Sequence, residues 1–264
     1  MLGAVIGDII GSRFEFSGKK QKNFTLFGEY SRFTDDTVMT CAIAKAILDC
    51  KGDYSELSAK AVACMQELGR KYPDRGYGGL FMHWLDEKYP QPYNSYGNGS
   101  AMRISPIAYA AKTIDEVKDL SRKVTIVSHN HPEGIKGAES VAVAIWLALH
   151  GKSKGDIREY IEENYYHIKD NYDDLPFTFL VDATCQETVP PSLYSFFITD
   201  SFEDAIRTAV AFGGDADTMA AITGSIAGAY YGIPKEVEIK ARSYLDEYLL
   251  AILDRFKKEF MQRG

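Results

Sequence analysis

Apolar residues recur every three or four positions along most of this chain, and this spacing limits its fold more than any other feature. Within residues 36–48, five of them fall on one side of a helix: Val38, Met39, Ile43, Ala46 and Ile47. Similar spacing predicts helices over residues 36–48, 55–71, 77–89, 101–112, 114–128, 134–150, 153–164, 202–212, 218–231 and 234–260. Sustained alternation of period two is absent, apart from a possible short extended piece around residues 177–181. The pattern therefore predicts an all-α fold, a compact bundle of many helices.

Glycine and proline gather between the expected helices, in residues 75–79, 89–99, 130–134 and Val189-Pro190-Pro191. We interpret these stretches as connections, because none is long or biased enough to link two domains. No fixed repeat period stands out. A chain of 264 residues can bury a large core, so we expect a single domain over residues 1–264.

The overall charge restricts the kinds of partner. Hydrophobic residues make up 45% of the chain and charged residues 25%, which are ordinary values for a globular protein. The formal net charge is -7, which argues against a general nucleic-acid surface or an anionic-membrane surface. A small phosphate ligand bridged by a metal ion remains compatible with this charge.

The cysteines and the amino-terminal stretch bear on the compartment. Cys41, Cys50, Cys64 and Cys185 form no Cys-x-x-Cys pair, so we expect buried thiols in a reduced, intracellular protein. The apolar stretch at residues 1–10 contains an aspartate, lacks a basic start and is too short to span a membrane. We therefore expect a cytoplasmic protein without a membrane segment.

Two acidic clusters carry the strongest chemical signal. They are Phe33-Thr34-Asp35-Asp36-Thr37 and Gly213-Gly214-Asp215-Ala216-Asp217-Thr218, and each places two carboxylates beside a threonine hydroxyl. Taken singly, each is typical of a helix start, because Thr and Asp are favoured caps and acidic residues complement the helix dipole. Four carboxylates in one place would repel one another unless a cation lay between them. Oxygen-only ligands of this kind suit Mg²⁺, Mn²⁺ or Ca²⁺ better than zinc.

A glycine turn, Tyr96-Gly97-Asn98-Gly99-Ser100, leads into an expected helix. Backbone N–H groups at a helix start can bind an anion, and glycines allow its close approach. The alternative is a plain Asn-Gly turn followed by a capped helix. The anion-binding interpretation gains weight only if the acidic clusters build a phosphate-handling site nearby.

Two further segments contain candidate site residues. In the loop 128–134, we expect one of His129 and His131 to contact a ligand and the other to be structural, because two histidines at this spacing are weak evidence for a metal site. Near the amino terminus, Asp8 could cap a helix or pair with Arg13. Glu15 lies between two phenylalanines, where an apolar collar would raise its pKa and suit it to acid/base work; it could equally extend into solvent.

Together these motifs resemble the ADP-ribosylglycohydrolase family, which includes dinitrogenase reductase-activating glycohydrolase and the ADP-ribosyl-acceptor hydrolases. The resemblance rests on both acidic clusters, on Gly7-Asp8 through Glu15 and on Gly97 to Arg103, in the order of the family. It extends from residue 3 to about Pro234. Residues 164–174 and 182–191 carry no family motif, and acceptor recognition is expected to involve such segments.

The resemblance implies an all-α fold and hydrolysis of an ADP-ribosyl linkage at the distal ribose, with an ADP-ribosylated protein or small molecule as substrate. It implies two divalent cations, Mg²⁺ or Mn²⁺, with these ligands: Thr34, Asp35, Asp36, Asp215, Asp217 and Thr218. Acid or base work would fall to Asp35, Asp36 or Glu15, where Glu15 corresponds to a mobile acidic residue of the family. Substrate contacts would come from Gly97, Asn98, Gly99, Ser100, Met102 and His129.

Two other functions are alternatives to this one. An all-α, Mg²⁺-dependent diphosphate enzyme would use Asp-Asp-x-x-Asp, but the positions four after Asp35 and Asp36 hold Met39 and Thr40. An ADP-ribose-binding module without turnover would be signalled by the loss of a ligand carboxylate, and all four are present. The sequence leaves open the linkage that is cleaved, the choice between Mg²⁺ and Mn²⁺, and the oligomeric state.

Overall fold

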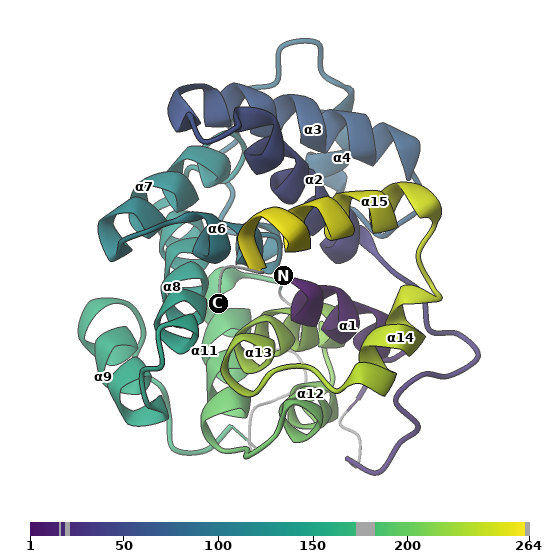
Figure 1. Ribbon diagram of the computed structural model, residues 1–264, viewed down its shortest axis with the longest axis vertical. Helices are drawn as coiled ribbons and strands as arrows, with labels where there is room; N and C mark the ends of the chain where they lie inside the picture. Colours follow the sequence, from purple (N-terminus) through teal and green to yellow (C-terminus); the bar gives the residue numbers. More distant parts are fainter. Residues whose placement is uncertain (16, 19–21, 173–182, 262–264) are drawn as a thin grey trace.

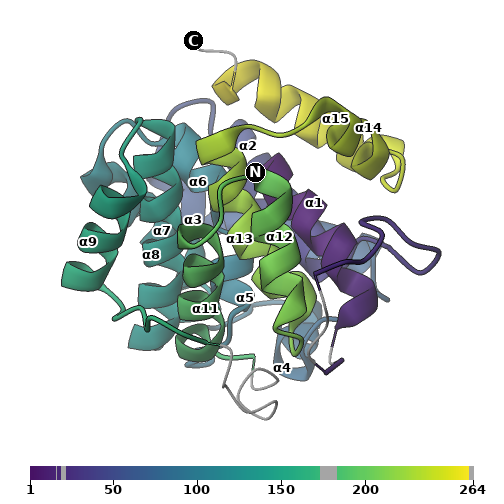
Figure 2. The same ribbon diagram turned by 90° about the horizontal axis from the view of Figure 1, so that it is seen from below.

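Helix α13 (Ala216–Tyr231) lies at the centre of the computed structural model and has other helices on several sides (Figures 1 and 2). The structure describes residues 1–15, 17, 18, 22–172 and 183–261. The other α-helices are α1 (Leu2–Gly11), α2 (Asp35–Cys50), α3 (Leu57–Lys71), α4 (Gly79–Asp86), α5 (Gly99–Met102), α6 (Ser105–Ala110), α7 (Ile114–Thr125), α8 (Pro132–Leu149), α9 (Lys154–Asn164), α11 (Cys185–Phe197), α12 (Phe202–Ala211), α14 (Lys235–Arg242) and α15 (Glu247–Phe256). Shorter helical turns are η1 (Ser12–Phe14), η2 (Tyr54–Glu56) and η3 (Lys257–Met261).

Helix α1 runs against α13 at a distance that only small side chains allow. A Cβ atom on Gly3 would lie 2.0 Å from the carbonyl oxygen of Gly224, and one on Gly7 would lie 2.0 Å from that of Ala220. No real Cβ atom fits at such a separation, so the backbones of the two helices are in direct contact.

The remaining helices pack around this pair. Helix α13 also contacts α8, α11 and α12, while α2 packs against α3, α15 and α1. Figure 1 shows α15 lying across α2, and both views place α9 at the edge of the molecule. Because α1 touches both α13 and α2, it fixes the position of the two helices that begin with the acidic clusters.

The predicted all-α class is confirmed. The described ranges contain no named β-strand, and only two isolated bridges occur there, Ser17 with Gly214 and Gly97 with Thr184. The possible extended piece at 177–181 lies outside the described residues. Across those same described ranges, no helix is both long enough and apolar enough to cross a bilayer. All four cysteines are free and buried, as expected from their spacing.

One expected connection is in fact a helix. Val189, Pro190 and Pro191 lie inside α11, where proline removes backbone N–H donors and would normally break the helix. Two hydroxyls bond backbone carbonyls inside this helix: Ser192 Oγ donates to Thr188 at 2.7 Å, and Ser195 Oγ donates to Pro191 at 2.9 Å. Helix α11 also packs on α8, α12 and α13. The prediction of a connection was wrong because tertiary burial outweighs the local preference of proline.

Two expected helices are each divided in two. Residues 234–260 form α14 and α15, because the Asp246 side chain accepts from the backbone N–H of Leu249 at 3.0 Å and starts a new helix. Residues 101–112 contribute to α5 and α6, and the second of these carries a proline in its first turn. Apolar spacing alone does not reveal such breaks, since it continues on both sides of them.

Replacing Gly7 with alanine tests the contact between α1 and α13. The added Cβ would meet a backbone oxygen, so we expect the free energy of unfolding to fall by at least about 1–3 kcal/mol. Gly155→Ala is the matched control, because Gly155 is exposed on α9 and its nearest Cβ neighbour would be Ser153 Oγ at 3.7 Å. That change should raise stability by about 0.5–1 kcal/mol in chemical denaturation. Equal effects of the two substitutions would contradict the close contact.

Candidate functional site

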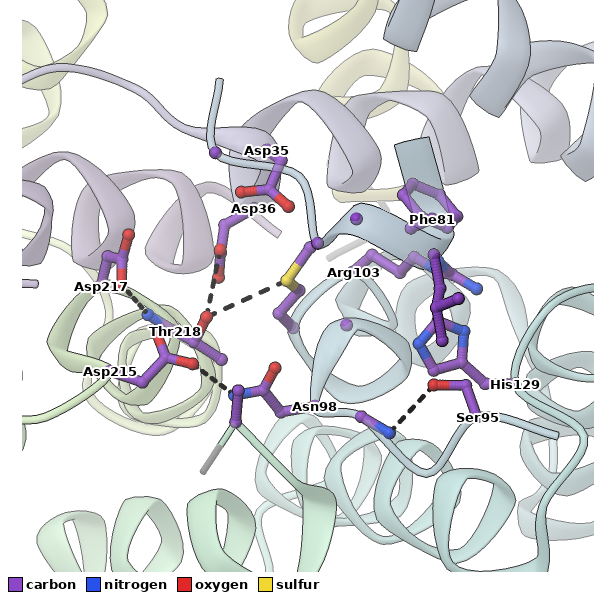
Figure 3. A pocket seen from close by; sticks show the side chains of 18 of the residues that line it. Asp35, Asp36, Phe81, Ser95, Asn98, Arg103, His129, Asp215, Asp217 and Thr218 are labelled. Carbon is purple, nitrogen blue, oxygen red and sulfur yellow. Dashed lines mark hydrogen bonds between the residues drawn. The ribbon is translucent and has the colours of Figure 1, made fainter. Parts of the chain in front are cut away.

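A cavity of about 330 Å³ opens where the amino-terminal ends of α2, α4, α5 and α13 meet. It lies between segments far apart in the sequence, and Figure 3 shows it from close by. Its walls are formed by Glu15, Asp35, Asp36, Gly76, Gly78, Gly79, Leu80, Phe81, Tyr93, Ser95, Gly97, Asn98, Gly99, Met102, Arg103, His129, Ala183, Asp215, Asp217 and Thr218. Both acidic clusters and the glycine turn therefore border one space.

The two acidic clusters touch directly. Thr218 Oγ1 donates to Asp36 Oδ2 at 3.2 Å, across 182 positions of the sequence. Asp35, Asp215 and Asp217 line the same cavity. Figure 3 shows the four carboxylates around one end of it. A helix cap explains each cluster separately, but it does not explain their convergence.

Glycine residues shape the approach to the second cluster. Gly213 and Gly214 adopt φ angles of 76° and 68°, which are strained for residues with a Cβ atom. A Cβ atom on Gly213 would also lie 2.5 Å from the carbonyl oxygen of Ser17, and the backbone N–H of Gly214 donates to that oxygen at 2.9 Å. The glycine pair thus turns the chain so that Asp215 starts α13 at the cavity.

The buried side chain of Asp8 holds the first acidic cluster in place by hydrogen bonds. Its carboxylate is fully buried and accepts hydrogen bonds from the backbone N–H of Thr34 at 2.9 Å and of Thr37 at 3.1 Å. It also accepts from Thr34 Oγ1 at 2.7 Å and from the Thr37 hydroxyl. Arg13 instead donates to the carbonyl of Thr25, so the Asp8–Arg13 pair weighed from the sequence is wrong. Asp8 secures the start of α2 from α1.

The carboxylates at the cavity perturb one another. The pKa values of Asp35 and Asp36 are raised well above the ordinary value. Burial is the largest cause, and repulsion from Asp8 and from other carboxylates, including Asp215, adds to it. The pKa of Asp217 is also raised well above the ordinary value, mainly by burial and then by repulsion from Asp215 and Asp36. Burial also raises the pKa of Asp8 to about 6, although its hydrogen bonds oppose the shift. Such a cluster keeps its full charge only if a cation offsets the repulsion.

Glu15 lines the cavity and is half-buried, so the sequence alternative in which it extends freely into solvent is not observed. Burial raises its pKa, Asp215 and Asp8 raise it further, and Arg32 opposes them. Its carboxyl therefore holds a proton to higher pH than an exposed glutamate does. This property suits proton transfer next to the aspartates.

The donor atoms suit a hard divalent cation. Asp36 Oδ1 is buried and has no hydrogen-bond partner in the described structure, a costly state that a bound cation would relieve. Thr218 lines the cavity beside it, whereas the Thr34 hydroxyl donates to Asp8 and does not line the wall. Within the described ranges, no three His, Cys, Asp or Glu side chains are already gathered closely enough to enclose an ion. The chemistry of the donors fits, and the ligand assignments remain predictions.

The glycine turn forms another part of the cavity wall. Gly97, Asn98, Gly99 and Met102 line the cavity. Asn98 Nδ2 donates to Asp215 Oδ2 at 2.6 Å, which links the turn to the second acidic cluster. Ser100 differs from the sequence expectation: its buried hydroxyl donates to the carbonyl of Gly134 at 2.8 Å and does not line the cavity. This placement indicates that the Ser100 side chain has a structural role, joining the turn to Gly134.

The two histidines of the following loop have separate surroundings. His129 lines the cavity, and a Cβ atom on Gly99 would lie 3.3 Å from its Nε2 atom. His131 caps α8 by accepting from the backbone N–H of Glu133 at 3.1 Å. Burial, and then the charge of Arg103, lower the pKa of His129 well below its ordinary value. One histidine therefore faces the cavity and the other is structural.

Sequence reasoning singled out neither Arg103 nor the aromatic wall of Phe81 and Tyr93. The Arg103 side chain is 1% exposed, lines the cavity, and lies 5.4 Å from the centre of the Phe81 ring. Its position at the end of the Gly97 to Arg103 motif was the available signal. The aromatic residues lie in stretches without a distinctive motif, so nothing in the sequence marked them.

The fold and site define an all-α protein with an acidic, glycine-bordered cleft. A protein-family model described as ADP-ribosylglycohydrolase matches residues 1–263. The chain therefore belongs to the ADP-ribosylglycohydrolase family, and it is an enzyme of the glycohydrolase class.

Individual relatives agree with this assignment. The human protein named ADP-ribosylhydrolase ARH3 is 26% identical, over 95% of this chain and 90% of its own length. The ADP-ribosyl-[dinitrogen reductase] glycohydrolase of Rhodospirillum rubrum is 27% identical, over 88% of this chain and 84% of its own. A solved structure described as an ADP-ribosylglycohydrolase-related protein complex superposes with a TM-score of 0.76, covering 97% of this chain and 95% of that chain at 23% identity. At that identity the structural match supports the shared fold.

Asp8→Asn tests whether the buried carboxylate secures the start of α2. The amide keeps the size but loses charge-assisted hydrogen bonds and turns an NH₂ group toward N–H donors. We expect the free energy of unfolding to fall by about 2–4 kcal/mol. Asp53→Asn is the control, since exposed Asp53 caps η2 and asparagine caps almost equally well. A loss no larger than that of the control would contradict this part for Asp8.

Proposed function

We propose that this enzyme hydrolyses an ADP-ribosyl linkage at the distal ribose, with two divalent cations, Mg²⁺ or Mn²⁺, held by the acidic clusters. The observation that carries the proposal is the division of charge within one cavity. The four aspartates lie toward one end (Figure 3). Glu15 also lines the cavity, and Arg103 is the sole lysine or arginine among the described residues lining it. A ligand that presents hydroxyl groups at one end and phosphates at the other fits this division.

The acidic end would receive the ribose. Asp35, Asp36, Asp215, Asp217 and Thr218 supply the oxygen donors for the cations, with Thr34 adjacent to them. When bound, the cations would supply a counter-charge and Lewis-acid polarisation of oxygen atoms. The residues themselves would orient the ribose diol and keep one face of the sugar against the wall of aspartates.

Cleavage at an anomeric carbon proceeds through an oxocarbenium-like state and needs a proton for the leaving group and a base for the water. Glu15, Asp35 and Asp36 line the cavity and are the candidates for these proton transfers. The half-buried carboxyl of Glu15, with its raised pKa, suits delivery of a proton. The developing positive charge on the sugar would lie beside the remaining carboxylates, which favour it electrostatically.

The opposite end would receive the diphosphate. The turn at Gly97 and Gly99 leaves the wall free of side chains, so phosphate oxygens can approach the backbone. Arg103 lines the cavity and contributes positive charge, and His129 borders the glycine turn. The aromatic rings of Phe81 and Tyr93 complete the cavity next to His129.

The names of the relatives support this substrate class. The human relative is named for ADP-ribosyl hydrolysis, and the Rhodospirillum rubrum relative is named for dinitrogen reductase. We propose an ADP-ribosylated protein or small molecule as the substrate here.

Release of free ADP-ribose from a panel of linkages tests the proposal, with and without added Mg²⁺ or Mn²⁺. The panel contains arginine-, serine- and nucleotide-linked ADP-ribose, poly-ADP-ribose and O-acetyl-ADP-ribose. We expect metal-dependent release from at least one of them and loss of release with a chelator. Tight binding of ADP-ribose without release from any linkage would instead support a binding module without turnover.

Asp217→Asn tests the metal-ligand assignment. The amide keeps the shape but removes one negative charge, so metal affinity should fall and turnover should drop by orders of magnitude. Asp204→Asn is the matched control: Asp204 is also an acid in the first turn of a helix but faces solvent. That change removes a dipole interaction of about 0.3–1 kcal/mol and an exposed ion pair with Lys22 at 3.5 Å, both remote from the cavity. Wild-type turnover of Asp217→Asn with full metal content would exclude this residue as a ligand.

Gly99→Val tests the glycine wall. Because even a Cβ atom would lie 3.3 Å from His129 Nε2, the valine side chain would fill the space assigned to phosphate. We expect affinity for ADP-ribose, measured by calorimetry, to fall by about tenfold or more, an order-of-magnitude figure for one lost charge-assisted contact. Metal content should stay at the wild-type level. Unchanged affinity would contradict phosphate binding at this turn.

A further inference from the structure

Arg103 is a buried cation with an incomplete set of partners. Its guanidinium Nη2 donates to Ser128 Oγ at 2.7 Å, while its Nε atom has no hydrogen-bond partner in the described structure. Burial lowers the pKa of this group to about 10, which still leaves it charged at neutral pH. A buried charge costs free energy, so this placement calls for an explanation.

The bond from Arg103 restricts the hydroxyl of Ser128. A guanidinium donates and cannot accept, so Ser128 Oγ must be the acceptor of that bond. The serine proton is then free to be donated elsewhere, and the side chain is fully buried. Among the described residues, the one acceptor in contact with it is His129 Nδ1 at 2.8 Å. Donation to Nδ1 is the arrangement that leaves no buried hydroxyl proton unsatisfied.

We infer that Ser128, oriented by Arg103, is a positioning residue that holds His129 as the neutral tautomer with its proton on Nε2. If Nδ1 accepts from Ser128, the proton of the neutral ring must lie on the other nitrogen. Protonation of both nitrogens is opposed by burial and by the nearby guanidinium, which together lower the pKa of His129. Thus His129 presents an N–H donor and does not serve as a base.

The Nε2 atom points toward the glycine turn. Cβ atoms on Gly99 and Gly97 would lie 3.3 Å and 3.7 Å from it, so the missing side chains leave room beside the ring. An Nε2–H group there can donate to an anionic oxygen, whereas the other tautomer would turn a lone pair toward it. This step rests on the proposed function, in which a phosphate of ADP-ribose occupies that space.

Long-range ¹H–¹⁵N NMR of the metal-loaded, ¹⁵N-labelled full chain reads the tautomer directly. The chain has five histidines, so His129→Gln identifies the signals of His129. We expect a protonated Nε2 and an unprotonated Nδ1 in the wild-type protein without ligand. A ring protonated on Nδ1, or on both nitrogens at neutral pH, would overturn the inference.

Ser128→Ala removes the donor. We expect mixed tautomers at His129 and an affinity for ADP-ribose lowered by about 3- to 10-fold, the effect of one impaired hydrogen bond. Ser128→Thr keeps the hydroxyl and should restore both readouts. Ser121→Ala is the matched control, because Ser121 is also buried and its hydroxyl has no hydrogen-bond partner in the described structure.

The readouts separate this inference from the proposed function. A pure Nε2–H signal in Ser128→Ala, with unchanged affinity, would overturn the positioning role of Ser128. The predicted tautomers in both proteins, combined with no ADP-ribose binding by the wild type, would support the positioning role and reject the proposed ligand. Equal losses in Ser128→Ala and Ser121→Ala would indicate a general packing effect and overturn the inference.

Discussion

The direct backbone contact between α1 and α13 is the constraint on which the site depends. Gly7 meets Ala220 of α13, and the adjacent Asp8 accepts hydrogen bonds from Thr34 and Thr37 at the start of α2. Two consecutive residues of one helix therefore set the positions of both acidic clusters. Because these contacts are made by backbone atoms and by a buried carboxylate, little freedom remains in the separation of the clusters.

This rigidity has an electrostatic cost. Asp36 is 2% exposed and Asp217 is 3% exposed, and burial followed by repulsion from neighbouring carboxylates raises the pKa of each. A chain selected for stability alone would avoid such a cluster, since buried like charges are unfavourable unless protonated or neutralised. The packing of α1 against α2 and α13 supplies the stability that holds these carboxylates together. A bound cation would relieve their mutual repulsion.

The sequence predicted the helical class, the two acidic clusters and the glycine turn, because each depends on local spacing or on a short motif. It missed α11, where Pro190 and Pro191 are held in a helix by burial against α5, α8, α12 and α13. The structural role of Asp8 also stayed open, because the hydrogen-bond donors to its carboxylate, Thr34 and Thr37, lie 26 and 29 positions further along the sequence. Arg103 and Ser100 show the same limit: which way a motif residue points is decided by distant segments, here Ser128 and Gly134.

Asn98 shows how the two ends of the cavity are joined. Its amide donates to Asp215 at 2.6 Å and to Thr188 Oγ1 at 3.0 Å, while the backbone on either side forms the glycine wall. A change of charge at Asp215 would therefore alter the hydrogen bond that holds Asn98 and with it the position of the glycine turn. This effect is strong because both groups are buried, where electrostatic interactions are little screened. The hydrogen bond of Asn98 thus couples the acidic part of the cavity to the glycine turn, so that the proposed ligand, spanning both, would be held by one connected structure and not by two independent sites.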